Sequence, residues 1–378
     1  ARRNGEEHLR LLGRAGVFRL EPHAWPAQQG GILLPDSGVV APDQVTIACA
    51  DNAVQNGARI FLNTAVIGLD VEGGRITGVR TNRGRLRGRV VINAAGVWAD
   101  RVAELADDRF YTIHPRKGVM AITDRSTGDL QRRSLGMMWI RRPGRTKGGG
   151  VSRTIEGNLL LGPTADEVPD REDHGTSCEE LEALLHRHMP LNAQLRPDQI
   201  IAYFAGVRAV TFEEDFVVEE SRRVANLIHV AGIQSPGLTA APAIAEDVRD
   251  LVVAMLRREV QVRARPEFDP CRKSPPSLSG LTLEERHRLI LRNPAYGRIV
   301  CRCEEVSEGE VVAAIGSPLP ATTVSAVKHR TRTGMGRCQG GFCTPSVLKL
   351  IAREMAVPAT RVTWQGGDSL MLAGETGE

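Results

Sequence analysis

Four cysteines near the C-terminal end of this 378-residue chain have the type and spacing to bind a metal centre. Cys301 and Cys303 form a C-x-C pair, and Cys338 and Cys343 form a C-x4-C pair farther along the chain. Four thiolates suit either a [2Fe–2S] cluster or a tetrahedral zinc ion. Zinc ribbons usually use C-x2-C pairs, so this spacing favours iron–sulfur, with zinc or unligated cysteines as the alternatives.

The residues around both pairs predict helices that start beside the cysteines. Ser307 and Glu310 have the spacing of a capping box, so a helix should begin directly after the first pair. The glycines of segment 334–341 allow backbone N–H groups to turn towards sulfur. Thr344-Pro345 is typical of an N-cap and first helical residue, and the positive end of that helix would favour a thiolate at Cys343.

Basic residues gather around the second cysteine pair. They are Lys328, His329, Arg330, Arg332 and Arg337. One interpretation is that they offset the charge of about −2 on an oxidised [2Fe–2S] centre with four thiolate ligands. The equally simple alternative is a solvated helix face.

Two segments of this region resemble the bacterioferritin-associated-ferredoxin-type (BFD-like) [2Fe–2S] domain. They are Cys301–Glu304 and Gly334–Cys343. The resemblance covers about residues 299–354 and implies a small all-α domain. Its [2Fe–2S] cluster would have four ligands: Cys301, Cys303, Cys338 and Cys343. In its best-known setting this module is fused to FAD-dependent dehydrogenases.

Composition limits the partners and the compartment. Lys and Arg total 49 against 45 Asp and Glu, and a net charge of +4 with no nucleic-acid-reading motif predicts no nucleic-acid partner. Cys49, Cys178 and Cys271 are scattered, which favours a reducing, cytoplasmic compartment over a disulfide framework. No stretch approaches the roughly 18 apolar residues that span a membrane. The chain starts without methionine or an apolar signal region, which predicts that it begins inside a longer gene product.

The hydrophobic pattern of residues 1–258 predicts a mixed α/β domain. The expected helices are 42–56, 98–105, 179–188 and 243–257, and the expected strands are 59–69, 75–81, 86–93 and 226–231. A Pro- and Arg-rich linker, 259–298, follows and contains one short helix at 283–291. Residues 355–378 form a Gly-rich tail, which we expect to be loosely ordered.

Two strand ends of this domain are suited to a ligand. The strand ending at Asn93 runs into Ala94-Ala95-Gly96, where small residues let a ligand approach the backbone. The strand ending at Ala231 runs into the turn 232–239, which offers N–H groups at a helix start to an anionic or carbonyl acceptor, unless it only caps the helix. The chain has no G-x-G-x-x-G fingerprint, so motifs alone do not predict a dinucleotide site.

Several segments nevertheless resemble, in family order, the D-amino-acid-oxidase-type FAD-dependent oxidoreductases, and the glycerol-3-phosphate dehydrogenase branch most. The segments are Glu21-Pro22, Asn63–Val66, Ile92–Asp100, Ile113–Gly118, Gly157–Thr164, Ala205–Arg208 and Gly232–Thr239. The resemblance implies an α/β (α+β) FAD-dependent oxidoreductase fold over 1–258. The first Rossmann βαβ unit, with the Gly-rich turn that binds the FAD pyrophosphate, is missing.

The resemblance also implies which residues contact FAD. These are Val66, Ala94, Ala95, Gly96, Gly232, Ile233, Gln234, Ser235, Gly237, Leu238 and Thr239. Val66 would contact adenine through its backbone, although a plain strand residue is the alternative. The N–H groups of the turn 232–239 would stabilise negative charge on the flavin pyrimidine ring.

Three residues are candidates for catalysis by the same resemblance. Arg208 would hold a carboxylate or phosphate of the substrate, because a guanidinium fork suits such anions. His114 and Arg116 are weaker candidates for substrate contact or proton transfer, and a strand histidine is more often structural. For Arg208 the plain alternative is a surface charge.

Two hypotheses about function follow. The first is an FAD-dependent dehydrogenase that passes electrons from glycerol 3-phosphate, or from a 2-hydroxy or amino acid, through flavin to a [2Fe–2S] cluster. The second is a non-catalytic electron-transfer or scaffold subunit of a heteromeric 2-hydroxy-acid or amino-acid dehydrogenase. Either hypothesis allows a redox partner protein or a quinone-linked membrane subunit, through which the chain would lie at the inner face of the membrane.

Overall fold

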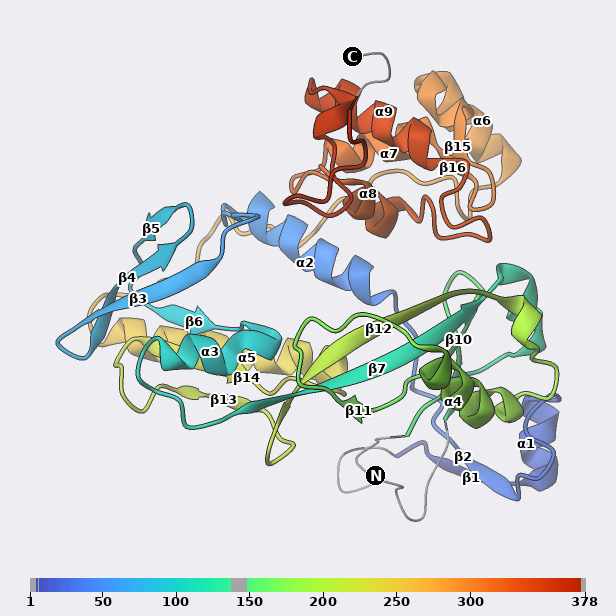
Figure 1. Cartoon of the computed structure of the whole chain (residues 1–378), viewed down its shortest axis with the longest axis horizontal. Helices are drawn as coiled ribbons and strands as arrows, with labels where there is room; N and C mark the ends of the chain where they lie inside the picture. The colour runs from blue at the N-terminus through green and yellow to red at the C-terminus, as the bar shows by residue number, and fades with distance from the viewer. Residues whose placement is uncertain (1–4, 6, 137–147, 375–378) are drawn as a thin grey trace.

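The computed structural model describes residues 5, 7–136 and 148–374 and shows two structural parts. Residues 7–258 form a part built on β-sheets, here called the sheet domain. Residues 299–371 form a mostly helical part that contains the four-cysteine motif, here called the cysteine domain. In Figure 1 the cysteine domain lies above the sheet domain, and helix α2 (Pro42–Gln55) runs between them.

The elements of the sheet domain alternate as its sequence pattern predicts. Before the central sheet come β1 (Arg10–Gly13), α1 (Arg14–Leu20), β2 (Gly30–Leu33), α2, β3 (Val66–Glu72), β4 (Arg75–Thr81), β5 (Gly84–Leu86), β6 (Val91–Asn93), η2 (Gly96–Trp98) and α3 (Ala99–Glu104). Then follow β7 (Ile113–Thr123), η3 (Arg125–Leu130), β8 (Leu135–Gly136), β9 (Gly150–Arg153), β10 (Leu159–Gly162), β11 (Asp166–Glu167) and α4 (Cys178–His188). The last are η4 (Met189–Leu191), η5 (Pro197–Gln199), β12 (Ile200–Thr211), β13 (Val217–Glu220), β14 (Leu227–Ala231) and α5 (Gly237–Arg257).

Strands β7 and β12 form the longest pairing of the molecule. They run antiparallel in register from Ile113↔Thr211 to Thr123↔Ile200, and the order β11-β7-β10-β9-β8 completes a six-stranded sheet. Helix α4 packs on this sheet with Leu184 fully buried, and it starts at a capping box formed by Ser177 and Glu180. The core between them contains Val119, Ala121, Val151, Leu159, Leu161 and Leu184.

A second sheet of order β13-β14-β6 lies beside the first, with β14 and β6 parallel. Helix α5 follows β14 and extends over 21 residues, yet only Gly237 and Met255 of this helix are buried. The helix begins six residues before the expected start at 243. Pro242 lies within its first turns, and a proline without an N–H is a typical stop signal, which explains the misplaced boundary.

Two predicted strands are wrong in their limits. The expected strand 59–69 begins only at Val66, where pairing with β4 starts. The expected strand 86–93 is divided into β5, which pairs with β4, and β6, which pairs with β14 in another sheet. Sequence hydrophobicity does not reveal which sheet a strand joins, so two short strands appeared as one.

The cysteine domain contains a small β-hairpin and three helices. Its elements are β15 (Ile299–Cys301), β16 (Val306–Ser307), α7 (Glu308–Ile315), α8 (Val324–Thr331), α9 (Thr344–Met355) and η7 (Ala359–Arg361). The predicted Ser307–Glu310 capping box is present at the start of α7. The N-cap of α9 is Cys343 and not Thr344, one residue earlier than expected. Residues after 355, expected to be a loose tail, supply buried Val362 to the domain core.

The linker 259–298 is held against both domains. It contains α6 (Leu283–Arg292) and η6 (Pro294–Gly297), close to the predicted short helix. Asn52 and Asn56 of α2 donate side-chain N–H groups to the carbonyl of Asp269. Farther along, the buried carboxylate of Glu310 accepts hydrogen bonds from the Ser277 hydroxyl and the Leu278 N–H. The linker is therefore hydrogen-bonded to α2 near its start and to α7 near its middle.

No helix within the described residues is both long and apolar enough to span a membrane.

Asp51 of α2 joins the linker, the cysteine domain and the sheet domain. Its carboxylate is 1% exposed and contacts Arg272 of the linker at 2.9 Å and Arg330 of α8 at 3.3 Å. It also accepts the N–H of Leu319 at 3.2 Å. A single buried carboxylate therefore compensates two arginines, and its removal would leave both charges poorly solvated.

We expect Asp51→Asn to lower the free energy of unfolding by about 3 kcal/mol, because it breaks a buried ion-pair network from one side. The matched control is Asp43→Asn, which breaks the more exposed Asp43–His329 contact of the same helix and should cost less than about 1 kcal/mol. Urea unfolding of the two variants measures the difference. Equal effects would show that Asp51 has no special role in joining the domains.

Candidate active site and cluster site

A cavity of about 520 Å³ lies where β12 meets the ends of the second sheet. It is lined by Gly96, Val97, Val207, Arg208, Ala209 and the segment Ile233–Thr239. The lining combines residues from both candidate strand ends with the candidate substrate arginine. Three regions that are far apart in sequence therefore converge on one pocket, as the ligand hypothesis requires.

Arg208 is the cationic residue of this pocket lining. Its Nη2 donates to the carbonyl of Thr164 at 3.0 Å and its Nη1 to the carbonyl of Lys117 at 3.4 Å. Among the described residues no carboxylate lies within ion-pair distance of its guanidinium. Burial, followed by the nearby charge of Arg116, lowers the pKa of Arg208. A half-buried cation of this kind, satisfied only by carbonyls, retains capacity for an anionic ligand.

Gly118 makes room for this guanidinium. The residue lies on β7 in register with Gly206 of β12. A Cβ atom at Gly118 would lie 2.2 Å from Nη2 of Arg208, whereas a Cβ at Gly206 would meet no atom within 4 Å. The arginine therefore lies flat over a strand position that has no side chain. Sequence analysis included Gly118 in a matching segment without this role.

Arg116 and His114, the other catalytic candidates, lie outside the pocket lining. Arg116 is 2% exposed and its Nη2 contacts the carboxylates of Glu214 at 2.8 Å and Glu167 at 3.1 Å. The ring of His114 is half-buried and lies 6.3 Å from that of Phe212. The geometry therefore favours Arg208 over either residue for contact with a substrate, and their catalytic roles stay predictions.

The backbone around the pocket has the expected conformations for close approach of a ligand. Gly96 has φ +56° and Gly232 has φ +68°, values that a side chain disfavours. The segment 233–239 leads into the first turn of α5, whose N–H groups have no helical partner. Ala94, Ala95 and Gly232 lie within two residues of lining residues in the chain but do not line the pocket themselves. Val66 begins β3 in a separate sheet and does not reach this cavity.

A buried polar network behind the pocket was missed by sequence analysis. His229 of β14 contacts Asp108 through Nε2 at 3.1 Å and the Tyr111 hydroxyl through Nδ1 at 3.0 Å. Asn93 of β6 donates to the carbonyl of Ala99 at 2.8 Å and contacts the same histidine. Burial lowers the pKa of His229 and raises that of Tyr111. The network ties the strand ends that lead into the pocket. In the sequence, only the polar residues Asn93 and His229 within otherwise apolar strands could have indicated this network.

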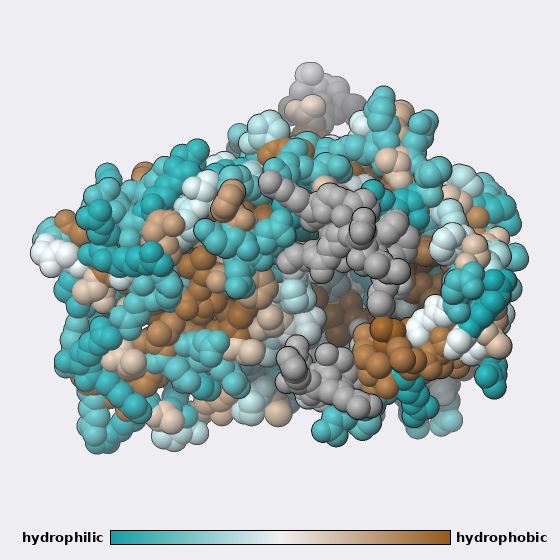
Figure 2. Space-filling view, turned by 90° about the horizontal axis from the view of Figure 1, so that it is seen from below, coloured by the Kyte–Doolittle hydropathy of each residue, from teal (hydrophilic) through white to brown (hydrophobic). Residues whose placement is uncertain are grey.

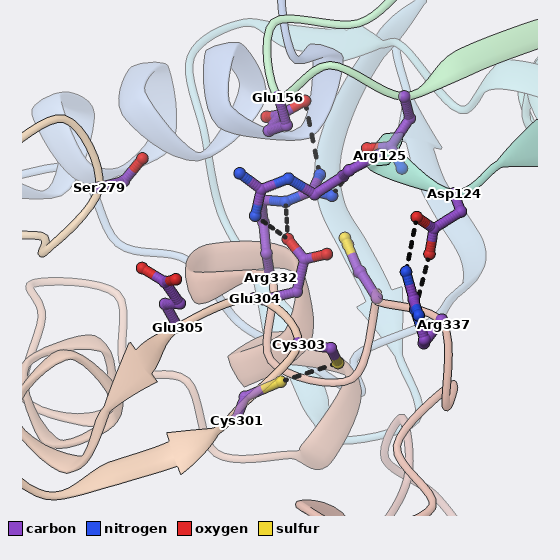
Figure 3. Close-up of polar contacts among 12 residues, drawn as sticks. Asp124, Arg125, Glu156, Ser279, Cys301, Cys303, Glu304, Glu305, Arg332 and Arg337 are labelled. Carbon is purple, nitrogen blue, oxygen red and sulfur yellow. Dashed lines mark hydrogen bonds and ion pairs between the residues drawn. The ribbon is translucent and has the colours of Figure 1, made fainter. Parts of the chain in front are cut away.

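Contacts between sulfur atoms join the four cysteines, and Figure 3 shows the contact between the first two, Cys301 and Cys303. The Sγ atoms of Cys301 and Cys303 are 3.8 Å apart, and those of Cys303 and Cys338 are 3.9 Å apart. Cys343 contacts Cys301 and is buried. The described residues contain no His, Cys, Asp or Glu group arranged around a single ion position. The thiols instead form a series in which each sulfur atom contacts the next.

Backbone amides surround the thiols, as the glycine pattern predicted. A hydrogen bond from Cys343, followed by those of the Gly334 and Glu304 amides, lowers the pKa of Cys301 to about 5. The Phe342 amide lowers the pKa of Cys338. Gly336 leaves space for the loop, since a Cβ there would lie 2.4 Å from the Cys303 sulfur. Amide donors facing sulfur fit a thiolate-ligated cluster, because such hydrogen bonds stabilise the charged ligands.

The sheet domain leaves several large hydrophobic side chains exposed near β6 and α5. Hydrophobic side chains form a broad patch in the left half of Figure 2, where Figure 1 places β13, β14 and α5. Leu238 of α5, Ile92 of the edge strand β6 and Trp98 are each more than 40% exposed. The pocket itself fits a flat ring system with polar edges, since Gly96 and Gly237 leave room beside the polar side chains of Gln234, Ser235 and Thr239.

Comparison with known families agrees with both domains. The family model described as FAD dependent oxidoreductase matches residues 1–251. The model described as BFD-like [2Fe-2S] binding domain matches residues 299–353. The second match favours an iron–sulfur cluster over the zinc alternative that cysteine spacing left open.

Curated relatives extend along nearly the whole chain. A glycerol 3-phosphate dehydrogenase of Caloramator mitchellensis is 35% identical over 99% of this chain and 76% of its own length. One component of the anaerobic glycerol-3-phosphate dehydrogenase of Escherichia coli K12 is 28% identical over 88% of this chain. The match spans only 66% of that component.

Solved structures show the same fold. A glycerol-3-phosphate dehydrogenase from Bacillus halodurans, complexed with FAD, has a TM-score of 0.68 at 19% identity. The match covers 92% of this chain and 76% of that one. From sequence, site and comparisons together, the chain belongs to the FAD-dependent oxidoreductase family, whose cofactor is FAD, and carries a C-terminal BFD-like [2Fe–2S] binding domain.

Proposed function

We propose that this chain is the flavin- and cluster-binding part of a glycerol 3-phosphate dehydrogenase. The observation that carries the proposal is Arg208, a half-buried guanidinium in the pocket with only carbonyl partners among the described residues. A phosphate monoester is an anion of the kind that this fork binds in bidentate geometry. The names of the curated relatives support the choice of substrate over 2-hydroxy and amino acids.

The residues assigned to each cofactor follow from the site. Gly96 and the segment 233–239 would face the flavin ring, and Cys301, Cys303, Cys338 and Cys343 would ligate the cluster. When bound, FAD takes up a hydride from a C–H group beside a hydroxyl, and a [2Fe–2S] cluster takes up one electron at a time. The N–H groups at the start of α5 would stabilise negative charge on the ring.

Arg208 would orient the substrate through its phosphate. Hydrogen bonds to two carbonyls already hold the guanidinium, which lies over Gly118. Little rotamer freedom of the side chain therefore remains to be lost on binding. Pre-organisation of this kind fixes one end of a small molecule and limits the positions of its hydroxyl carbon. The low dielectric of the half-buried site strengthens the contact.

We infer that the described residues would hold only part of the FAD. The exposed length of α5, the edge strand β6 and the absent G-x-G-x-x-G motif all leave the dinucleotide without pyrophosphate donors. We infer that an upstream segment of the same polypeptide supplies a strand, a Gly-rich turn and a helix. The chain alone would then hold FAD weakly, and the extended chain tightly.

The same open surface favours a second candidate function. If the missing unit is never supplied, the chain would act as an electron-transfer or scaffold subunit within a larger dehydrogenase. In either case we propose that electrons leave through the cluster to a redox partner protein or a quinone-linked membrane subunit. An in-frame Gly-rich fingerprint upstream of residue 1 distinguishes the first function from the second.

Anaerobically purified protein is expected to contain about two irons and two labile sulfides per chain, the composition of a [2Fe–2S] centre. Cys338→Ser should lose the cluster and lower the stability of the cysteine domain, because ligands in a small domain contribute directly to folding. Metal and sulfide analysis with visible spectra measures both. One zinc and no iron would overturn the assignment. Cys49→Ser, at an exposed thiol far from the motif in sequence, is the control.

Arg208→Ala in the extended, flavin-loaded enzyme should lower kcat/KM for glycerol 3-phosphate at least about 30-fold, because a charge-assisted bidentate contact is lost. Arg208→Lys should recover only part of the activity, since a point charge cannot reproduce the fork. Flavin and cluster contents should equal those of the wild type. Full activity of the alanine variant would return Arg208 to a structural role.

Gly118→Ala tests the same contact from the opposite strand. Its methyl group would push the guanidinium from its place, so we expect KM to rise about tenfold with a smaller change in kcat. The effect should disappear in an Arg208→Ala background, because the two residues act on one contact. Gly206→Ala, whose Cβ meets open space at the paired position, is the matched control. Additive losses in the double variant would contradict this geometry.

A further inference from the structure

Four of the five basic residues near the second cysteine pair contact the sheet domain, and the fifth, Lys328, lies over the Trp364 ring of its own domain. Arg337, next to Cys338, contacts Asp124 at the end of β7 through Nε at 3.0 Å and Nη2 at 3.1 Å. His329 and Arg330 contact carboxylates of α2. The charge interpretation drawn from sequence is therefore incomplete, because these residues serve the contact between the domains. Figure 3 shows the cluster loops with their partners.

Arg332 contacts three side chains through one guanidinium. Its Nη2 donates to the side-chain oxygen of Asn158 at 3.1 Å, and its Nη1 lies 3.5 Å from the Glu156 carboxylate. Both partners belong to the turn between β9 and β10. Its Nε donates to Glu304, the neighbour of Cys303, at 2.8 Å. One guanidinium therefore links the first cysteine loop of the cysteine domain to a turn of the sheet domain.

Glu304 depends on this link for compensation of its charge. Its side chain is 2% exposed, and its Oε1 has no hydrogen-bond partner among the described residues. Besides Arg332, its nearest described cation is Arg125 of the sheet domain at 3.8 Å. A buried carboxylate with so few partners is costly unless its cation stays in place.

The backbone of Arg332 is strained for an arginine. The residue caps the C-terminal end of α8 with φ +67° and ψ +5°, in the left-handed region. Glycine or asparagine is the usual residue there, because other side chains crowd the backbone in this conformation. A strained position that keeps a long charged side chain points to a requirement for that side chain.

We propose that Arg332 is a positioning residue that locks the first cysteine loop onto the β9–β10 turn. This contact would set the orientation of the cluster towards the sheet domain. The domains stay joined without it, because the linker and the Asp51 network are separate from the lock. Loss of Arg332 would therefore loosen one face and not detach the domain. The proposal rests on the proposed function only for its consequence in electron transfer.

Arg332→Gly removes the lock and the backbone strain together. Glycine fits φ +67° without strain, and this gain partly offsets the loss of the cation beside buried Glu304, so the melting temperature of the cluster-loaded protein should fall less than in Arg332→Ala, which keeps the strain. Hydrogen exchange of the Gly157 and Asn158 amides in the turn should accelerate at least about tenfold, since a charge-assisted contact that covers the turn is lost. Exchange in α9, within the cysteine-domain core, should stay unchanged. The matched control is Arg353→Gln, which removes an Arg–Glu pair inside the same domain and should leave the turn protected.

Unchanged exchange of the turn in Arg332→Gly would overturn the proposal, as would equal acceleration in Arg353→Gln.

A second readout uses the extended, flavin-loaded enzyme with glycerol 3-phosphate and an added one-electron acceptor, ferricyanide. The lock predicts that the variant reduces the acceptor at least about fivefold more slowly, with flavin bleaching at the wild-type rate. If the wild type itself fails to bleach with substrate, the proposed function fails, while the exchange experiment still decides the lock.

Discussion

The antiparallel ladder of β7 and β12 positions both candidate sites of this chain. Arg208 and Arg116 lie in register near one end of the ladder, and Asp124, which contacts the cysteine domain, follows the other end. Eight residues separate Arg116 from Asp124 along the chain, or roughly 27 Å at the rise of an extended strand. Because paired strands resist shear, the pocket beside Arg208 and the contact of Asp124 with the cysteine domain are held at opposite ends of one ladder. Neither site is built by this ladder alone.

Each site completes itself with segments from elsewhere in the sequence. The pocket adds the strand ends at Gly96 and 233–239, which the buried network around His229 holds in place. The cluster side adds α2, whose Asp51 compensates arginines of the linker and of α8. The exposed faces of α5 and β6 differ from these sites, because no described segment covers them. They explain why an FAD-dependent family member is proposed to need a further segment for tight flavin binding.

Local sequence signals predicted the local structure well. Capping boxes gave the start of α7, the strand 75–81 was correct at both ends, and the cysteine pairs met as their spacing indicated. These features depend on neighbours within a few residues. The start of α5 was wrong because a proline mid-turn is tolerated there. The division of 86–93 into two strands depends on sheet partners that lie far away in sequence.

The roles of charged residues were the least predictable. Arg208 lines a pocket, and its contact with a substrate stays a prediction, whereas two carboxylates hold Arg116. Four of the five basic residues near Cys338 contact the sheet domain, and two acidic partners there, Asp124 of Arg337 and Glu156 of Arg332, lie more than 150 residues away in the chain. A charge can be read from sequence, but its partner is set by tertiary packing.

We propose that substrate electrons reach the cluster of this chain. The most direct measurement adds glycerol 3-phosphate, without oxygen, to the chain extended by its upstream segment and loaded with FAD and iron–sulfur. Electron paramagnetic resonance then reports the reduced cluster, with dithionite-treated protein as the reference. The proposed electron transfer predicts loss of flavin absorbance together with the signal of a reduced [2Fe–2S] centre. A cluster that dithionite reduces but substrate leaves oxidised, in protein with bleached flavin, would contradict it.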